Sequence, residues 1–511
     1  MELTLKQMLG QKIILGFHGT ELPEDFKALI RQYRIGNVIL FQRNVESADQ
    51  LRKLCGEIRQ VVLEACGFLP FIVIDQEGGM VSRLPYDAVN IPSAMALGAA
   101  GDPENAALGA KITARQLRGL GPNFNMAPVL DVNTNPRNPV IGIRSYGDDP
   151  QKVAGFAEAV VKAYEGTGIF CCGKHFPGHG DTAVDSHLGL PTVNKTMEEL
   201  EKAELIPFHR AIAAGIPAIM SSHILFPNIE PDNVPCTMSR RIITGLLKEK
   251  LGFRGLVFSD CLEMQAIQKY YGTSKGMAAA FRAGIDLAEI SCTFSLEADA
   301  VRYVNEAAER GEFDLEEIRA SAEKIIAFKK QLEDFPLEKQ LCNRQEDREL
   351  VEKMARQAIS LYDGSPFPVT DRTFYCGCAD YRTTEAANSS ACVEPFPRYM
   401  QKHLGGGAMV TDKNPGEAQI REAAAMAKEY DTIVLSTCNA HLFEGQLALA
   451  RALAETGKPM MAVTTRNPYD LPLLPECACR ISAYDYTESS FQALVRVLKG
   501  EKITGTIPVK L

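Results

Sequence analysis

Short, nearly continuous apolar runs alternate with helical patterns over the first 330 residues of the chain. Runs of this kind are typical of strands in a buried parallel sheet. The eight predicted strands are QKIILGF (11–17), GNVILF (36–41), FIVID (71–75), FNMAPVLD (124–131), IFCCGKH (169–175), PAIMSSH (217–223), LVFSD (256–260) and IDLAEI (285–290). Amphipathic helices are predicted between most of them, for example over 47–65 and 198–215. Eight strand–helix units predict a (β/α)8 barrel, and the strand count favours it over a doubly wound sheet.

The chain, at 511 residues, is too long for a single hydrophobic core. A second α/β pattern begins after residue 365, with strand candidates TFYCGC, AMVT, TIVLSTC, MMAVTT and RISAYDY. We therefore expect an α/β protein with a TIM-like barrel domain over 1–333, a helical linker over 334–365, and a smaller α/β sandwich domain over 366–511. The glycine-rich HLGGGAMV does not follow a strand, which argues against a dinucleotide-binding loop.

Charge and composition argue against several classes of function. The net charge is −9 and no block of basic residues occurs, which argues against a nucleic-acid partner. No apolar stretch of about 20 residues and no leader pattern is found, so we expect no membrane span and a cytoplasmic protein. The fourteen cysteines are scattered, as is typical of reduced, buried thiols. Composition does not predict an oligomeric state.

Polar residues follow the predicted strands at the points where these end. The five strand-end residues are Asp75, Asp131, His175, His223 and Asp260. In a barrel, all of these positions lie at the C-terminal face, where barrel active sites are built. This placement predicts a catalytic site rather than a solvated surface.

The stretch GKHFPGHGDTAVDSHLG (173–189) concentrates three histidines and two aspartates. Residues 168–174 match GxxxxGK, but the next residue is His175 and the intervening residues are strand formers, which argues against a phosphate loop. A metal site at His175, His179 and His187 stays open, although Pro177 and Gly178 prevent a shared helix face.

The third interpretation of this stretch is acid/base catalysis by Asp185 and His187. A carboxylate two residues from an imidazole can hold its Nδ1–H and leave Nε2 free for proton transfer. The alternative is an Asx-turn beside a solvated histidine. Asp260, expected on the same barrel face, favours catalysis.

KHFPGHGDTAVDSH resembles the signature of the β-N-acetylglucosaminidase branch of glycoside hydrolase family 3. Six further segments resemble the family in its order: GNVILFQRN, VIDQEGGMVSRL, NFNMAPVLDV, IGIRSYGDDP, IMSSHILFP and VFSDCLEM. The second domain resembles that of the two-domain members at TTRNPYDLPLLP and ITGTIPV. The resemblance covers most of the chain.

The resemblance implies a retaining mechanism. Asp260 would be the nucleophile, His187 the acid and then the base, and Asp185 would orient His187. The residues implied to bind the sugar are Asp75, Arg83, Arg144, Lys174 and His175. Arg83 and Arg144 could instead only pair with barrel carboxylates, and His223 is expected to be a satisfied barrel histidine. The sequence departs from expectation at Cys261, where a small or acidic residue is more usual, and at Glu289, where an apolar residue is expected. Both could alter the leaving-group side of the pocket.

The implied activity is that of an exo-β-N-acetylglucosaminidase acting on a small glycan with a terminal N-acetylglucosamine, derived from muropeptides or chitin, in peptidoglycan recycling. No metal or cofactor is implied. Three alternatives stay open: a phosphorylase that uses phosphate as acceptor, a non-catalytic glycan-binding protein, and a metal hydrolase. The phosphorylase is considered because a neutral histidine, unlike a carboxylate, would not repel a phosphate anion.

Overall fold

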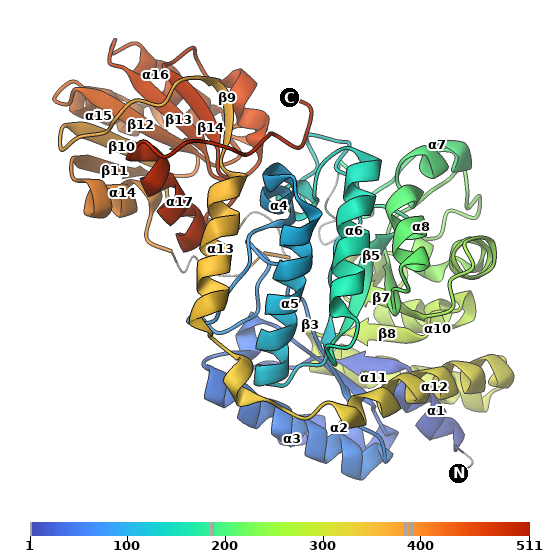
Figure 1. Cartoon of the computed structure of the whole chain (residues 1–511). Coiled ribbons are helices and arrows are strands. Elements are labelled where there is room, and N and C mark those ends of the chain that lie inside the picture. The colour runs from blue at the N-terminus through green and yellow to red at the C-terminus, as the bar shows by residue number, and fades with distance from the viewer. Residues whose placement is uncertain (1–2, 184, 186–188, 383–385, 388–392) are drawn as a thin grey trace.

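A computed structural model describes residues 3–183, 185, 189–382, 386–387 and 393–511. The N-terminal domain is a closed barrel of eight parallel strands in sequence order, with the last strand paired to the first (Figure 1). The strands are β1 Ile13–Leu15, β2 Asn37–Leu40, β3 Phe71–Ile74, β4 Phe124–Asn125, β5 Phe170–Phe176, β6 Ala218–Ser221, β7 Leu256–Cys261 and β8 Leu287–Ile290. Each overlaps a predicted run, and the predicted barrel is confirmed.

Helices surround the barrel and begin at capping residues. Ser47 accepts a hydrogen bond from the Gln50 N–H at the start of α3, and Asp149 caps α6. The helices of this domain are α1 Leu5–Gln11, α2 Glu24–Tyr33, α3 Ala48–Cys66, α4 Ala94–Ala100, α5 Pro103–Leu120, α6 Pro150–Tyr164, α7 Met197–Lys202, α8 Leu205–Ala213, the π-helix η4 Arg241–Lys250, α9 Gln265–Gln268, α10 Thr273–Ala283, α11 Phe294–Glu309 and α12 Leu315–Lys330. In the described part of the chain, no helix is both long enough and apolar enough to cross a membrane.

The single helix predicted over 198–215 is wrong, because the chain breaks it into α7 and α8 at Ala203. Pro207 gives the physical reason. It lies in the first turn of α8, where its missing N–H leaves no hydrogen bond unmade. A continuous helix would place the same proline in its interior and would lose one backbone hydrogen bond there.

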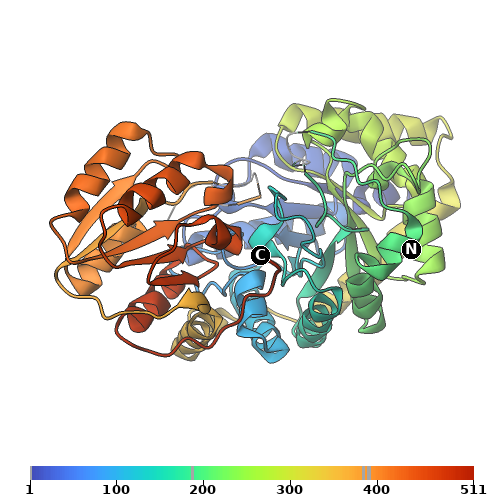
Figure 2. The same ribbon diagram turned by 90° about the horizontal axis from the view of Figure 1, so that it is seen from above.

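The C-terminal domain is a six-stranded sheet in the order β11-β10-β12-β13-β14-β9 between two layers of helices (Figure 2). Its strands are β9 Ser360–Gly364, β10 Thr373–Cys378, β11 Gly407–Thr411, β12 Thr432–Thr437, β13 Met460–Thr464 and β14 Cys479–Ser482. Its helices are α14 Phe396–Leu404, α15 Glu417–Ala427, α16 Glu444–Ala454 and α17 Glu488–Leu498. Side chains of α15 and α16 pack on one face of the sheet, and those of α14 and α17 pack on the other.

The segment expected to be a helical linker differs from the prediction at its end. The helix α13 Gln345–Ala358 is present, but the residues after it form β9, which pairs antiparallel with β14. Only the first residue of β9 is fully buried. A strand at the edge of a sheet needs no continuous apolar run, and the sequence therefore carried no strand signal there.

The two domains contact each other through α13 and through the loops at the C-terminal face of the barrel. The helix α13 packs against α4 of the barrel and α17 of the second domain (Figure 1). The Ser93 N–H donates to Asp485 at 2.8 Å, and Asn133 donates to the Tyr469 hydroxyl at 2.8 Å. The last residues of the chain return to the barrel, where the Lys510 N–H donates to Asp148 at 2.7 Å (Figure 2).

Candidate active site

A cavity opens at the C-terminal ends of the barrel strands. Its volume is about 1520 Å³, counting the open space at its mouth. Six of the eight predicted site residues line it: Asp75, Arg83, Arg144, Lys174, His175 and Asp260. Arg382 and Ala386 of the C-terminal domain also line it, so both domains contribute to its wall.

The alternation of side chains along the barrel strands explains the floor of this cavity. Successive strand residues point to opposite faces, so residues two apart share a face. The apolar cluster inside the barrel includes Val73, Cys172 and Leu287. The residues two positions further along these strands, Asp75, Lys174 and Glu289, form the next layer and line the cavity. A polar layer thus lies directly above the apolar filling of the barrel.

Two strands lose their regular register at this layer. The pairing of β5 with β6 shifts between Gly173 and Phe176, and the pairing of β7 with β8 shifts between Phe258 and Cys261. Such irregularities re-aim side chains and are common beside active sites. Here two consecutive residues of each strand line the cavity, Lys174 with His175 and Asp260 with Cys261.

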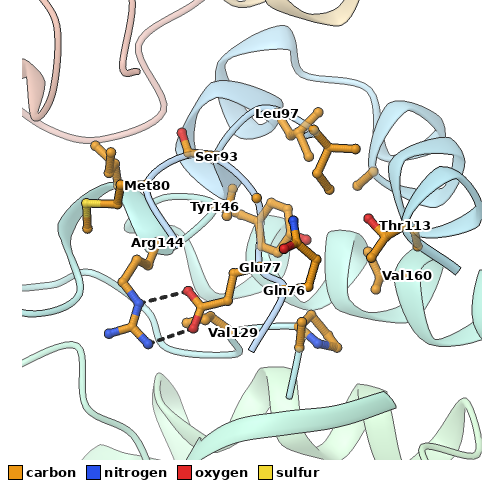
Figure 3. Close-up of a pocket in the computed structure, with 18 of the residues that line it drawn as sticks. Gln76, Glu77, Met80, Ser93, Leu97, Thr113, Val129, Arg144, Tyr146 and Val160 are labelled. Carbon is orange, nitrogen blue, oxygen red and sulfur yellow. Dashed lines mark hydrogen bonds and ion pairs between the residues drawn. The ribbon is translucent and has the colours of Figure 1, made fainter. Parts of the chain in front are cut away.

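A chain of ion pairs runs along one wall of the cavity. The Lys174 ammonium lies 2.6 Å from Asp75 and 2.7 Å from Glu77. Arg144 donates two hydrogen bonds of 2.8 Å to the carboxylate of Glu77 (Figure 3). Burial opposes ionisation of Glu77, but the charges of Arg144 and Lys174 outweigh it and hold the pKa of this carboxyl well below its usual range. The pairing holds both cations in position beside the cavity.

Asp131 organises the two histidines of the β5 loop. Its carboxylate accepts a 2.7 Å hydrogen bond from His175 Nδ1 and a 2.6 Å bond from the His179 N–H. His175 Nε2 lies 3.4 Å from Arg144. Burial and the neighbouring His175 lower the pKa of His179 to about 4, so its ring is neutral at pH 7. The ring of His179 bonds the Thr182 hydroxyl at 2.8 Å, so His179 serves to hold the loop.

Arg83 joins the cavity to the second domain. Its N–H donates to the side chain of Gln76 at 2.8 Å, and its guanidinium donates to the Ala386 carbonyl at 2.6 Å. Burial lowers the pKa of Arg83 from its usual value. The contact with Ala386 places Arg83 where the C-terminal domain meets the mouth of the cavity.

The three predicted catalytic residues fall in different places. Asp260 lies at the end of β7, partly exposed to the cavity, and its carboxylate accepts a 2.8 Å hydrogen bond from the Cys261 N–H. Asp185 is described and buried, with 5% of its surface exposed. His187 lies outside the described residues.

His223 is a satisfied barrel histidine, as expected. It is fully buried, and its ring nitrogens bond the Thr237 hydroxyl at 2.9 Å and the Cys261 carbonyl at 3.0 Å. For the metal hypothesis, the ring nitrogens of His175 have protein partners in Asp131 and Arg144. Within the described ranges, no group of three or more histidine, cysteine, aspartate and glutamate side chains is arranged to hold a metal ion.

Sequence reasoning assigned no sugar-binding or catalytic role to five charged residues of the cavity: Arg43, Glu77, Glu263, Glu289 and Arg382. Glu77 follows the strand-end Asp75 by two residues, and the same alternation that singles out Asp75 could have found it. Glu289 was noted as a departure from an apolar pattern that could alter the leaving-group side of the pocket, but not as a sugar-binding residue. Arg382 belongs to the other domain, and no local pattern indicates that it reaches the barrel.

Comparisons with known proteins agree with this geometry. Residues 2–328 match the family described as the glycosyl hydrolase family 3 N-terminal domain. The chain is 37% identical over 295 residues to a β-hexosaminidase of Thiobacillus denitrificans, covering 57% of this chain and 80% of that protein. It is 34% identical over 368 residues to β-hexosaminidase A of Pseudoalteromonas piscicida, covering 65% of this chain but only 62% of that protein.

A solved structure is similar over the whole length of the chain. It is that of a glycoside hydrolase family 3 β-N-acetylglucosaminidase from Paenibacillus sp. FPU-7, with 36% identity and a TM-score of 0.94. The match covers 100% of this chain and 99% of that one. The similarity therefore includes both domains and the way in which they are joined.

Proposed function

The chain belongs to glycoside hydrolase family 3, and from this premise we propose that it is a retaining, exo-acting β-N-acetylglucosaminidase. The observation that carries the proposal is the cavity at the C-terminal face, where Asp260 lies beside a layer of paired polar groups. The likeness to a β-N-acetylglucosaminidase over 99% of that chain supports the same sugar specificity.

The proposed reaction has two steps. The Asp260 carboxylate attacks the anomeric carbon and forms a covalent glycosyl-enzyme, while His187 donates a proton to the leaving oxygen. His187 then takes a proton from the incoming water, whose oxygen attacks the anomeric carbon and breaks its bond to Asp260, so that the sugar is released and the carboxylate is regenerated. Asp185 holds the imidazole in the required tautomer. A histidine suits both proton transfers near neutral pH, since its reference pKa is about 6.5.

The other site residues bind and orient the sugar in this proposal. Asp75 accepts hydrogen bonds from ring hydroxyls, and Lys174, His175, Arg144 and Arg83 donate to hydroxyls and to the N-acetyl group. The ion pairs of Lys174 and Arg144 and the bond from His175 to Asp131 support this role, because they fix the donors before substrate binds. We further propose muropeptide-derived or chitin-derived fragments as substrates and a cytoplasmic role in peptidoglycan recycling.

Two variants test the catalytic roles on an activated aryl N-acetyl-β-glucosaminide. Asp260→Asn should lose formation of the glycosyl-enzyme, because the amide is a poor nucleophile. His187→Ala should retain glycosylation by a good leaving group but slow the second step, so that the glycosyl-enzyme accumulates and is seen by mass spectrometry. Equal and mild losses in both variants would show that the catalytic roles do not belong to Asp260 and His187.

Phosphorolysis is a second candidate, because Arg43, Arg83 and Arg382 line the cavity and could attract a phosphate ion as the acceptor. Identifying the products formed with and without inorganic phosphate distinguishes hydrolysis from phosphorolysis. Release of N-acetylglucosamine 1-phosphate as the main product would replace the hydrolase assignment. Binding of N-acetylglucosamine without any turnover would indicate a glycan-binding protein, and loss of activity with a chelator would indicate a metal hydrolase.

A further inference from the structure

Glu289 points into the barrel from the last strand. Along β8, Leu287 belongs to the apolar cluster inside the barrel, whereas Ala288 and Ile290 pack in the cluster outside it. Glu289 therefore shares the inward face with Leu287 and lies one layer closer to the cavity. It lines the cavity together with Asp75 and Asp260, although only 3% of its surface is exposed.

The backbone of Glu289 is firmly held. Its N–H donates to the Ser259 hydroxyl at 2.9 Å, and its carbonyl accepts from the Leu262 N–H at 2.9 Å. The residue also pairs with Ile14 of β1 and Cys261 of β7 in the barrel register. Because strand pairing on both sides fixes the main chain, the side chain of Glu289 leaves the barrel wall from a defined position beside the cavity.

The carboxyl of Glu289 differs from the other acidic groups of the site. Asp75, Glu77 and Asp131 each pair with a lysine, an arginine or a histidine. The charged groups that act most strongly on Glu289 are Asp75, Asp260 and Cys292, and all three are acidic, whereas a hydrogen bond with the Ser291 side chain acts in the opposite direction. Burial, and after it the charges of Asp75 and Asp260, raise the pKa of Glu289 well above its usual value, which favours the protonated form of this carboxyl over the ionised one.

A protonated carboxyl both donates and accepts a hydrogen bond. A sugar hydroxyl has the same two capacities, whereas an apolar residue at this position would offer neither. We propose that Glu289 is a substrate-binding residue that hydrogen-bonds a hydroxyl group of the terminal sugar and so helps to determine which sugars the pocket accepts. The proposal rests on the proposed glycosidase function and adds to it a contact on the floor of the sugar pocket.

The test combines two variants with a set of modified substrates. Glu289→Leu removes both hydrogen-bonding capacities, and Glu289→Gln keeps one donor and one acceptor at the same size. The substrates are the 4-nitrophenyl N-acetyl-β-glucosaminide and its 3-deoxy, 4-deoxy and 6-deoxy analogues. We expect Glu289→Leu to lower kcat/KM on the parent substrate by roughly tenfold or more, because the partner hydroxyl is left unpaired. Glu289→Gln should recover most of this loss.

One deoxy analogue should identify the partner hydroxyl. The wild type should cleave this analogue as poorly as Glu289→Leu cleaves the parent substrate. Glu289→Leu should cleave the analogue no more poorly than it cleaves the parent, because the same hydrogen bond is already lost. Glu297→Gln is the matched control, since Glu297 is also buried with a raised pKa but does not line the cavity.

Three outcomes would overturn the proposal. The first is wild-type kcat/KM in Glu289→Leu. The second is that the loss in kcat/KM caused by Glu289→Leu and the loss caused by the deoxy change multiply for all three analogues, so that no single hydroxyl depends on Glu289. The third is an equal loss in Glu289→Leu, Glu289→Gln and Glu297→Gln, which would indicate a purely structural role. If the wild type does not cleave the parent substrate at all, the proposed glycosidase function fails instead, and the two failures are therefore distinct.

Discussion

Glu77 is the residue on which the charged wall of the pocket depends. It is almost fully buried and bonds both Arg144 and Lys174, and Lys174 in turn bonds Asp75. Removing one partner of a buried pair leaves an uncompensated charge, which costs far more than the net contribution of the pair itself. Loss of the Glu77 charge would leave two cations with one carboxylate, Asp75, between them.

Glu77→Gln is expected to lower the free energy of unfolding by about 3–5 kcal/mol, since it leaves buried charge unpaired. It should also lower kcat/KM at least tenfold, because Arg144 and Lys174 are no longer held beside the cavity. Urea unfolding and steady-state kinetics measure the two effects. Glu57→Gln is the control, because Glu57 pairs with Lys27 at a partly exposed site and should cost no more than about 1 kcal/mol. Equal losses in both variants would contradict the role of Glu77.

Residues at strand ends were predictable from the sequence, but their partners were not. Asp75, His175 and Asp260 were identified because each follows an apolar run, and all three line the cavity. The pairing of Lys174 with both Asp75 and Glu77 depends on how two strands approach across the barrel. Local patterns contain no information about that approach, so the ion-pair chain became visible only in the fold.

The loops that follow β4 and β5 are closely packed against each other at Gly180. A Cβ atom on Gly180 would lie 1.7 Å from the Val132 carbonyl oxygen, which no side chain can tolerate. The Asn135 N–H also donates to the Gly180 carbonyl at 3.3 Å. This contact holds the β5 loop, which leads to Asp185, against the β4 loop that carries Asp131.

Gly180→Ala should displace the β5 loop and lower kcat/KM at least tenfold, because the added methyl group overlaps backbone atoms that cannot move aside cheaply. Kinetics and the melting temperature measure the effect. Gly155→Ala is the control: this position in α6 has no atom within 4 Å of the added Cβ, and alanine should stabilise the helix by about 0.5–1 kcal/mol. Wild-type activity in Gly180→Ala would show that catalysis does not depend on the position of this loop.

Elements with a strong hydrophobic periodicity were predicted correctly, whereas features that depend on packing in the folded protein were not. All eight barrel strands are largely buried and overlap the apolar runs from which they were predicted. The edge strand β9 has mostly exposed residues and was taken as part of a helical linker. The irregular pairing of β5 and β7 lets consecutive residues share the cavity, which a strict period of two excludes.

At the scale of the whole molecule, the second domain completes a site that the barrel alone leaves open. Arg382 and Ala386 lie in the cavity wall, and Ala386 accepts a hydrogen bond from Arg83. The domains were predicted from composition and pattern, but the interface was not. It is built from loops such as that of Ser93, whose polar residues have no periodic signature.

Asp485 makes the domain interface sensitive to pH. Its carboxylate accepts a hydrogen bond from Ser93 of the barrel, yet burial raises its pKa from 3.8 to about 6, because that bond and the charge of Arg466 do not fully offset the loss of water. Between pH 4 and pH 6 the unfolded chain loses this proton while the folded protein keeps it. The free energy of unfolding therefore falls as pH rises through this window.

Asp485→Asn should abolish this contribution, because the amide keeps an acceptor for Ser93 and does not ionise. A shift of this size corresponds to about 3 kcal/mol. The variant should match the wild type near pH 4 and exceed it by up to that amount above pH 6, as measured by urea unfolding at a series of pH values. Asp363→Asn is the control, since Asp363 lies on the edge strand β9, where Arg480 lowers its pKa. A stability difference between Asp485→Asn and the wild type that is the same at every pH would show that Asp485 stays ionised at the interface.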